Sequence, residues 1–99
     1  MKQLAIIIPA YKPRFLQETL DSIAKQNNHE FTVYIGDDAS PYPLETIVDC
    51  YKNKFDIIYH RFEQNMGKKD LPGHWERCIL LSEEELIWLF SDDDLMPFD

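Results

Sequence analysis

Three consecutive aspartates near the end of the chain, Asp92, Asp93 and Asp94, are the strongest sign of chemistry in the sequence. They follow the apolar run 86–90, which has the length of a buried strand. Carboxylates about 4 Å apart repel each other by roughly 4 kcal/mol at an effective dielectric constant of about 20, so the cluster must be solvated or hold a cation. Such oxygen ligands suit Mg²⁺ or Mn²⁺. The residues alone leave open an acidic turn and a metal site.

A second acidic pair, Asp37 and Asp38, follows another apolar run and precedes Ala39 and Ser40. Aspartate and serine in this pattern favour a turn or a helix cap, in which side-chain oxygens accept main-chain N–H groups. A carboxylate here could instead accept a hydrogen bond from a base or a ribose hydroxyl of a nucleotide. Both interpretations stay open for Asp38.

Other side chains also have two interpretations. Tyr11 follows the first apolar run and could pack on a base or in the core. Lys68 and Lys69 could neutralise a pyrophosphate or lie solvated in a polar loop. Trp75 is expected in the core rather than stacked on a sugar. The cysteines and histidines have no metal-ligand spacing, so we expect the former as small apolar residues on helix faces and the latter at the surface or at helix starts. These residues are Cys50, Cys78, His29, His60 and His74.

Apolar spacing predicts four strands that alternate with three helices. Strands are expected at residues 2–8, 31–36, 56–62 and 86–90, and helices over 13–26, 44–51 and, after a long polar loop, 75–79. This alternation implies an α/β domain with a mostly parallel sheet and right-handed crossovers. Ligands of such sheets bind outside the carboxyl ends of the strands. We therefore expect the polar stretches 9–12, 37–40, 65–69 and 92–94 to converge on one crevice.

The composition favours one small globular domain. Of the 99 residues, 44% are hydrophobic, which is enough for a packed core. The formal net charge of −8 and the scattered basic residues argue against nucleic acid as a partner. No apolar run is long enough to span a bilayer, and the first residues do not form a signal peptide. We expect a cytoplasmic protein, with peripheral attachment to the inner face of the membrane left open.

Five motifs, in order and spacing, resemble the signature of family 2 glycosyltransferases. They are Ile6-Ile7-Ile8-Pro9-Ala10-Tyr11, Leu20-x-x-Ile23-x-x-Gln26, Val33-Tyr34-Ile35-Gly36-Asp37-Asp38-Ala39-Ser40, Asn65-Met66-Gly67 and Trp88-Leu89-Phe90-Ser91-Asp92-Asp93-Asp94. The resemblance covers nearly the whole chain. It implies the GT-A fold, a Rossmann-like three-layer α/β/α arrangement. Residues 1–99 would form the nucleotide-sugar-binding, N-terminal part of a GT-A glycosyltransferase domain that is truncated here.

The resemblance also implies an activity. A member of this family transfers a sugar from a nucleoside diphosphate sugar, here expected to be a UDP-sugar, to a hydroxyl of a carbohydrate or lipid-linked acceptor, usually with Mn²⁺ or Mg²⁺. The usual setting is cell-surface polysaccharide or lipopolysaccharide biosynthesis. The catalytic base of inverting members would lie beyond Asp99. The nucleotide-sugar-binding residues expected here are Pro9, Ala10, Tyr11, Asp38, Lys68, Asp92 and Asp93.

The aspartate cluster corresponds to the DxD motif of the family. Asp92 and Asp94 are the expected metal ligands, whereas a register that begins at Ser91 would make Asp93 the ligand. The second-strand motif departs from the family pattern at two positions, with Ala39 where glycine is common and Gly36 where an aliphatic residue is common.

Three alternatives remain beside this interpretation. The chain could bind nucleotide without further activity. A receiver-type signalling domain also gathers aspartates at strand ends, but it would want an acidic pair after the first strand. A sugar nucleotidylyltransferase would want a glycine-rich phosphate loop there, and residues 9–12 contain no glycine.

Overall fold

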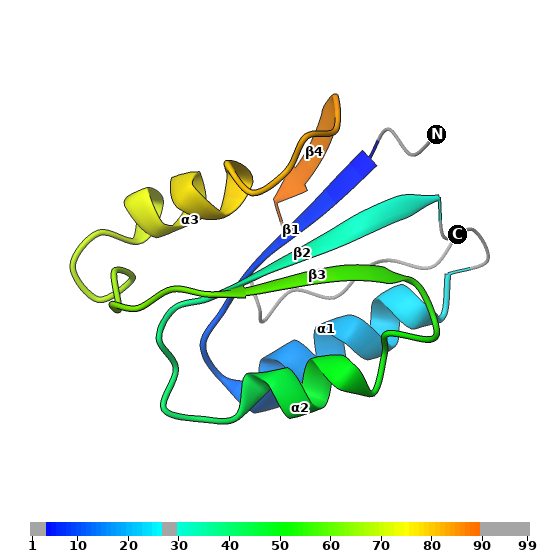
Figure 1. The fold of residues 1–99 in the computed structure, drawn as a ribbon, viewed down its shortest axis with the longest axis horizontal. Helices are drawn as coiled ribbons and strands as arrows, with labels where there is room; N and C mark the ends of the chain where they lie inside the picture. Colours follow the sequence, from blue (N-terminus) through cyan, green and yellow to red (C-terminus); the bar gives the residue numbers. More distant parts are fainter. Residues whose placement is uncertain (1–3, 27–29, 90–99) are drawn as a thin grey trace.

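The computed structural model describes residues 4–26 and 30–89, in which strands and helices alternate as predicted (Figure 1). In chain order the elements are β1 (Leu4–Ala10), α1 (Pro13–Ala24), β2 (Phe31–Asp37), α2 (Leu44–Asp49), β3 (Asp56–Arg61), α3 (Leu71–Ile79) and β4 (Leu86–Leu89). Among these residues, no helix is long and apolar enough to cross a membrane.

The four strands form one parallel sheet in the order β3-β2-β1-β4. The prediction of parallel strands is therefore confirmed. Strand β2 pairs with one edge of β1 and β3 pairs with the far edge of β2, whereas β4 pairs with the other edge of β1. Ligands of open α/β sheets bind at such a reversal of strand order. A receiver-type sheet would place β1 between β2 and β3, so the topology argues against that alternative.

Helices cover both faces of the sheet, which confirms the three-layer arrangement. Figure 1 shows α1 and α2 on one face and α3 on the other. Successive side chains of a strand point to opposite faces. Accordingly Ile6 and Ile8 join the core beneath α1 and α2, whereas Ala5 and Ile7 pack with Cys78 of α3. The run Leu4–Ala10 is apolar throughout because both of its faces are covered.

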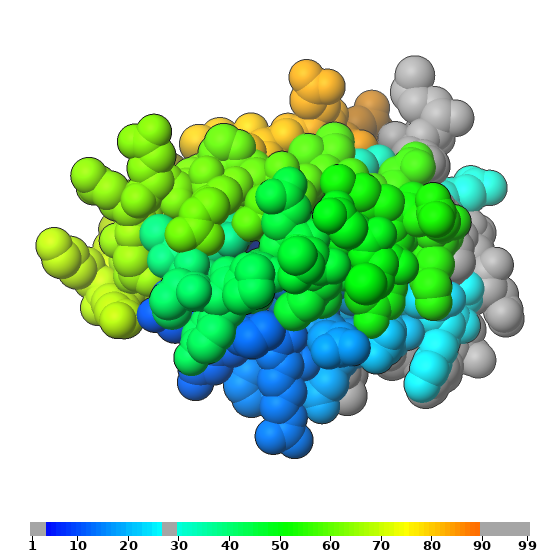
Figure 2. Space-filling model, turned by 60° about the horizontal axis from the view of Figure 1, so that its bottom comes forward, coloured from blue at the N-terminus to red at the C-terminus, as the bar shows by residue number. Residues whose placement is uncertain are grey.

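Helix α1 shows how sequence periodicity becomes packing. Its fully buried apolar residues, Leu16, Leu20 and Ile23, lie on one face. Pro13 occupies the first turn, where the N–H that proline lacks would have no helical partner. Figure 2 shows the side of the molecule on which α1, in blue, lies beside α2, in green.

Several boundaries and burial predictions differ from the structure. Strand β1 does not end at Pro9 but continues to Ala10. Helix α3 begins at Leu71 rather than after residue 73, because the Asp70 carboxylate caps it by accepting the Gly73 N–H at 3.0 Å. Cys50 follows the last turn of α2 and is exposed, so its predicted place on an apolar helix face is wrong.

Candidate functional site

The ends of β1 and β2 are joined by hydrogen bonds. The Asp38 N–H donates to the Ala10 carbonyl at 2.9 Å, and Ser40 Oγ donates to the Tyr11 carbonyl at 2.6 Å. The first two polar stretches are therefore side by side, as the sequence predicted.

Asp37 is fully buried, and protein donors surround its carboxylate. Oδ1 accepts the Ser40 N–H at 2.9 Å, and Oδ2 accepts the Tyr59 hydroxyl and Arg61 Nη1, the latter at 3.1 Å. Burial, and next the hydrogen bond to Asp37, raise the pKa of the Tyr59 phenol, so it stays protonated and donates. Asp37 thus anchors the turn that follows β2.

Asp38 holds the loop after β3. Its side chain is 6% exposed. Oδ1 accepts the Met66 N–H at 2.7 Å, Oδ2 accepts the Gly67 N–H at 2.8 Å, and the main-chain carbonyl accepts Asn65 Nδ2 at 2.9 Å. A Cβ at Gly67 would lie 2.5 Å from Asp38 Oδ2, so a side chain at Gly67 would displace the carboxylate.

Arg77 of α3 is the cationic partner of the Asp38 carboxylate. Its Nη2 lies 2.8 Å from Asp38 Oδ1 and 3.0 Å from the Gln64 carbonyl. Its guanidinium carbon lies 3.9 Å from the centroid of the Phe62 ring, within the range of a cation–π contact. A buried carboxylate needs such compensation because an unpaired charge is costly in the interior.

His74 completes this group and is neutral. Its side chain is 2% exposed, and Nδ1 accepts Arg77 Nε at 2.9 Å, which leaves the ring proton on Nε2. Burial, opposed by Asp38 and assisted by Arg77, lowers the pKa of His74 below its ordinary value. The 3.6 Å approach of Nδ1 to Asp38 Oδ1 is therefore not an ion pair. Of the two places predicted for the histidines, the surface is wrong for His74, which is buried, whereas its position in the first turn of α3 agrees with a helix start.

Tyr11 and Lys68 meet at the edge of this cluster. Lys68 Nζ lies 5.8 Å from the centroid of the half-buried Tyr11 ring. The ring also lines a depression of about 350 Å³ with Lys12, Pro13, Arg14, Phe15 and Tyr42. Three of the four predicted stretches therefore converge. The fourth, with Asp92, Asp93 and Asp94, lies outside the described residues.

The three residues predicted to bind at the end of the first strand differ in how far a ligand could reach them. Pro9 is buried opposite Gly36 in the sheet, and the 1% exposed Ala10 packs in the core beneath α1 and α2. Tyr11, directly after β1, is the most exposed of the three. Trp75, expected in the core, is half-buried.

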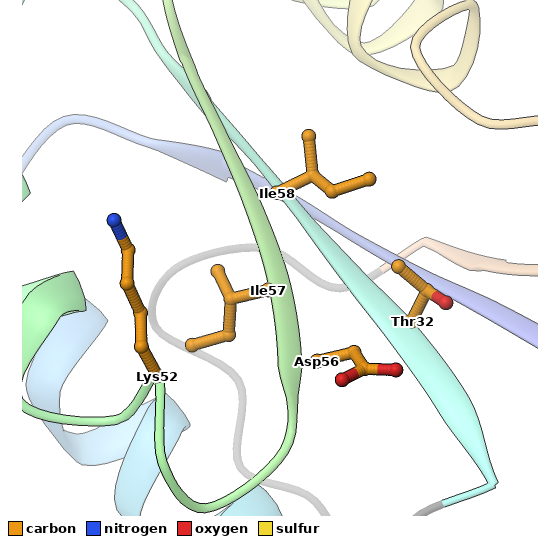
Figure 3. A pocket seen from close by; sticks show the side chains of 5 residues that line it. All are labelled: Thr32, Lys52, Asp56, Ile57 and Ile58. Carbon is orange, nitrogen blue, oxygen red and sulfur yellow. The ribbon is translucent and has the colours of Figure 1, made fainter.

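A larger depression, of about 440 Å³, lies at the opposite end of the sheet. Figure 3 shows its lining residues around β3, with Lys52 and Ile57 on one side of the strand and Thr32 and Ile58 on the other. Thr32 and Asp56 lie near the amino ends of β2 and β3. This depression is therefore remote from the polar residues at the carboxyl ends.

The described residues contain no group of three acidic, histidine or cysteine side chains that could hold a metal ion. Asp37 and Asp38 do not provide such a site, because each carboxylate already faces an arginine and main-chain N–H groups.

Sequence reasoning missed Arg77 and His74. The signal that could have found them is their spacing, because residues three and four apart on a helix share one face. His74, Arg77 and Cys78 stand in that relation. Cys78 is the one apolar residue among these three, so the apolar spacing of the sequence did not predict that this helix face is buried.

The strand order and the polar cluster at the strand ends define an α/β domain of the nucleotide-binding type. Residues 5–99 match the family model described as glycosyl transferase family 2, and the chain belongs to that family. The resemblance seen in the sequence is thus confirmed.

Relatives and solved structures agree with this assignment. The chain is 33% identical over 97 residues to poly(ribitol-phosphate) beta-N-acetylglucosaminyltransferase TarS of Staphylococcus aureus. These aligned residues are 95% of this chain and 16% of that protein. It is 43% identical over 60 residues to chondroitin synthase of Pasteurella multocida, over 59% of this chain and 6% of that protein. The crystal structure of residues 1–349 of S. aureus TarS superimposes with a TM-score of 0.82 at 27% identity, over 94% of this chain and 28% of that one.

Two further structures are informative. TarS 1–349 in complex with UDP-GlcNAc superimposes with a TM-score of 0.80 at 29% identity, over 94% of this chain and 27% of that one. A mannosyltransferase from Pyrobaculum calidifontis, in complex with GDP-Man and Mn²⁺, gives a TM-score of 0.80 at 19% identity, over 96% of this chain and 28% of that one, and shares the fold.

Proposed function

We propose that this chain is the nucleotide-sugar-binding part of a glycosyltransferase. The enzyme would transfer a sugar from a UDP-sugar to a hydroxyl of a carbohydrate or lipid-linked acceptor, in cell-surface polysaccharide biosynthesis at the inner face of the membrane or in the cytoplasm. Family membership and the TarS relatives, whose structures hold UDP and UDP-GlcNAc, support this donor. The chain spans 16% of the TarS length, so the acceptor would be bound largely by other residues.

The observation that carries the proposal is the assembly of three strand ends around Asp38, whose N–H donates to the Ala10 carbonyl and whose carboxylate accepts the Met66 and Gly67 N–H groups. Asp38 holds Met66 and Gly67, and the loop that contains them brings Lys68 beside Tyr11. An aromatic ring next to a cation suits a nucleotide, because the ring can stack on a base while the cation faces phosphate.

Each residue would have a distinct role. Tyr11, at the end of the motif that includes Pro9 and Ala10, would form the wall of the base pocket. Asp38 Oδ2 accepts one N–H within the described structure, and a carboxylate oxygen can accept two, so one position is left for a base N–H. Lys68 would lie toward the diphosphate.

The metal is a further part of the proposal. Asp92 and Asp94 would hold Mn²⁺ or Mg²⁺, with Asp93 toward the nucleotide sugar, or Asp93 would be the ligand in the other register. The ion would stabilise the negative charge that develops on the departing nucleoside diphosphate. For residues 1–99 alone we propose nucleotide binding without transfer, since the resemblance places the base beyond Asp99.

Calorimetric titration with UDP tests this function. We expect binding of UDP with Mn²⁺ and weaker binding after chelation, with GDP and CDP as competitors. Asp38→Ala should weaken binding by about 1–3 kcal/mol, the range for loss of a buried hydrogen-bonding partner. Asp49→Ala is the matched control, because Asp49 is exposed and pairs with Lys52 at 3.0 Å. No binding of any nucleoside diphosphate by the folded protein would refute the proposal.

A further inference from the structure

Two neighbouring carboxylates at the end of β2 have different cationic partners. Asp37 pairs with Arg61, whose side chain is 50% exposed, at 3.1 Å. Asp38 pairs with Arg77, whose side chain is 19% exposed, at 2.8 Å. Arg77 is also fixed on its other sides by the Phe62 ring and by His74. The second pair is therefore the more enclosed and the more precisely oriented.

The Arg77 guanidinium connects three elements of the site. It reaches from α3 to the end of β2 through Asp38 and to the loop after β3 through the Gln64 carbonyl. The same Asp38 oxygen that it contacts also accepts the Met66 N–H at 2.7 Å. A planar guanidinium fork fixes such directions better than the point charge of a lysine.

The loop after β3 depends on this carboxylate. Asn65 caps the turn by accepting the Lys68 N–H at 3.2 Å, while Met66 and Gly67 donate to the two oxygens of Asp38. If the carboxylate rotated, both N–H groups would lose their acceptor and Lys68 would leave its place beside Tyr11. Orientation of the carboxylate is thus coupled to the position of Lys68.

We propose that Arg77 is a positioning residue for nucleotide binding: it orients the Asp38 carboxylate and, through Met66 and Gly67, places Lys68 beside Tyr11. This inference rests on the proposed function. In this role Arg77 acts on the nucleotide through Asp38. His74 supports it by accepting Arg77 Nε, which keeps the fork aimed at Asp38.

Two measurements on the full chain test this role. Arg77→Met should weaken UDP affinity on the order of tenfold, as expected for loss of a charge-assisted hydrogen bond. It should also speed hydrogen exchange of the Met66 and Gly67 amides, with Val33 and Ile35 in β2 unchanged. Lys52→Met is the control: Lys52 pairs with the exposed Asp49 away from the site, so this change should alter neither quantity. In an Asp38→Asn background, Arg77→Met should have no further effect on the two amides.

Other outcomes would overturn the role. If Arg77→Met weakens UDP binding while both amides stay protected, Arg77 acts directly on the ligand. If exchange rises equally in the loop and in β2, Arg77 contributes only to global stability. If Arg77→Met does not fold, Arg77→Lys keeps the charge without the fork, and wild-type affinity and exchange in that variant would refute the inference. Absence of UDP binding in the unmodified protein would defeat the proposed function, and the exchange measurements would still decide the role of Arg77.

Discussion

The main chain of Gly36 in β2 lies directly against the side chain of Cys78 in α3, and a Cβ added at Gly36 would lie 2.2 Å from Cys78 Sγ. The contact fixes the distance between the sheet and the helix that carries Arg77. It also explains a departure from the family pattern, because an aliphatic residue at Gly36 would displace α3. Burial raises the pKa of the Cys78 thiol to about 12, so the residue acts as a small apolar side chain, as predicted.

We expect Gly36→Ala to destabilise the protein by about 1–3 kcal/mol through overpacking. Cys78→Ala should reverse part of this loss in the double variant, since the nearest remaining atoms, of Phe62 and of the Cys78 Cβ, would be 3.1 and 3.3 Å away. Urea unfolding measures both effects. Gly73→Ala tests specificity: its Cβ would lie 2.3 Å from the Asp70 carboxylate that caps α3, so it should also destabilise the protein, but Cys78→Ala should not reverse that loss. Additive effects of the two substitutions would contradict the contact.

Ala39 has a left-handed backbone conformation, with φ of 53°. This conformation costs a residue other than glycine about 1–2 kcal/mol. Ala39→Gly should therefore raise the free energy of unfolding. The gain should be at most about 1 kcal/mol, because the greater conformational entropy of glycine in the unfolded chain offsets part of the relieved strain. Ala24→Gly, at the end of α1, should lower it by roughly 0.5–1 kcal/mol. Equal losses in both variants, measured by thermal unfolding, would be inconsistent with strain at Ala39.

The buried His74 predicts a dependence of stability on pH. Burial lowers the pKa of His74 in the folded protein. In the unfolded chain the side chain has the ordinary histidine pKa of about 6.5. Its contribution to stability is therefore fully present above about pH 6.5 and is lost as pH falls toward the folded pKa. The slope should reach up to about 1.4 kcal/mol per pH unit.

His74→Gln should flatten this part of the profile, because a glutamine oxygen can accept Arg77 Nε without titrating. The free energy of unfolding from urea titrations between pH 7.5 and 5 gives the comparison. An identical slope in the two proteins would show that His74 is not the titrating group.

The aspartate cluster predicts a metal effect on diphosphate binding. UDP affinity should rise with Mn²⁺, whereas uridine should bind equally with and without it, because only the diphosphate would be repelled by the uncompensated carboxylates. Asp94→Asn should remove most of this metal dependence, and Asp93→Asn should matter less. A larger effect of Asp93→Asn would assign the register that begins at Ser91. If neither change alters metal-dependent binding, the cluster is an acidic turn.

The sequence by itself determined the elements and their order. Apolar runs such as Leu4–Ile8 and the four-residue spacing of Leu16 and Leu20 are local, and local periodicity is sufficient to predict strands and helices. The parallel sheet followed because each pair of consecutive strands is separated by a helix. Convergence of the strand ends followed in turn, since all carboxyl ends of a parallel sheet lie at one edge.

Only the tertiary structure decided which residues meet at that edge. Asp38 contacts Arg77, 39 positions away, and the same carboxylate binds Met66 and Gly67. No local pattern encodes these contacts, because they depend on where α3 lies over the sheet. The position of α3 is set by the close approach of Cys78 to Gly36. The burial of His74 has the same origin: its environment comes from β2 and the loop after β3, which are distant in sequence and adjacent only after folding.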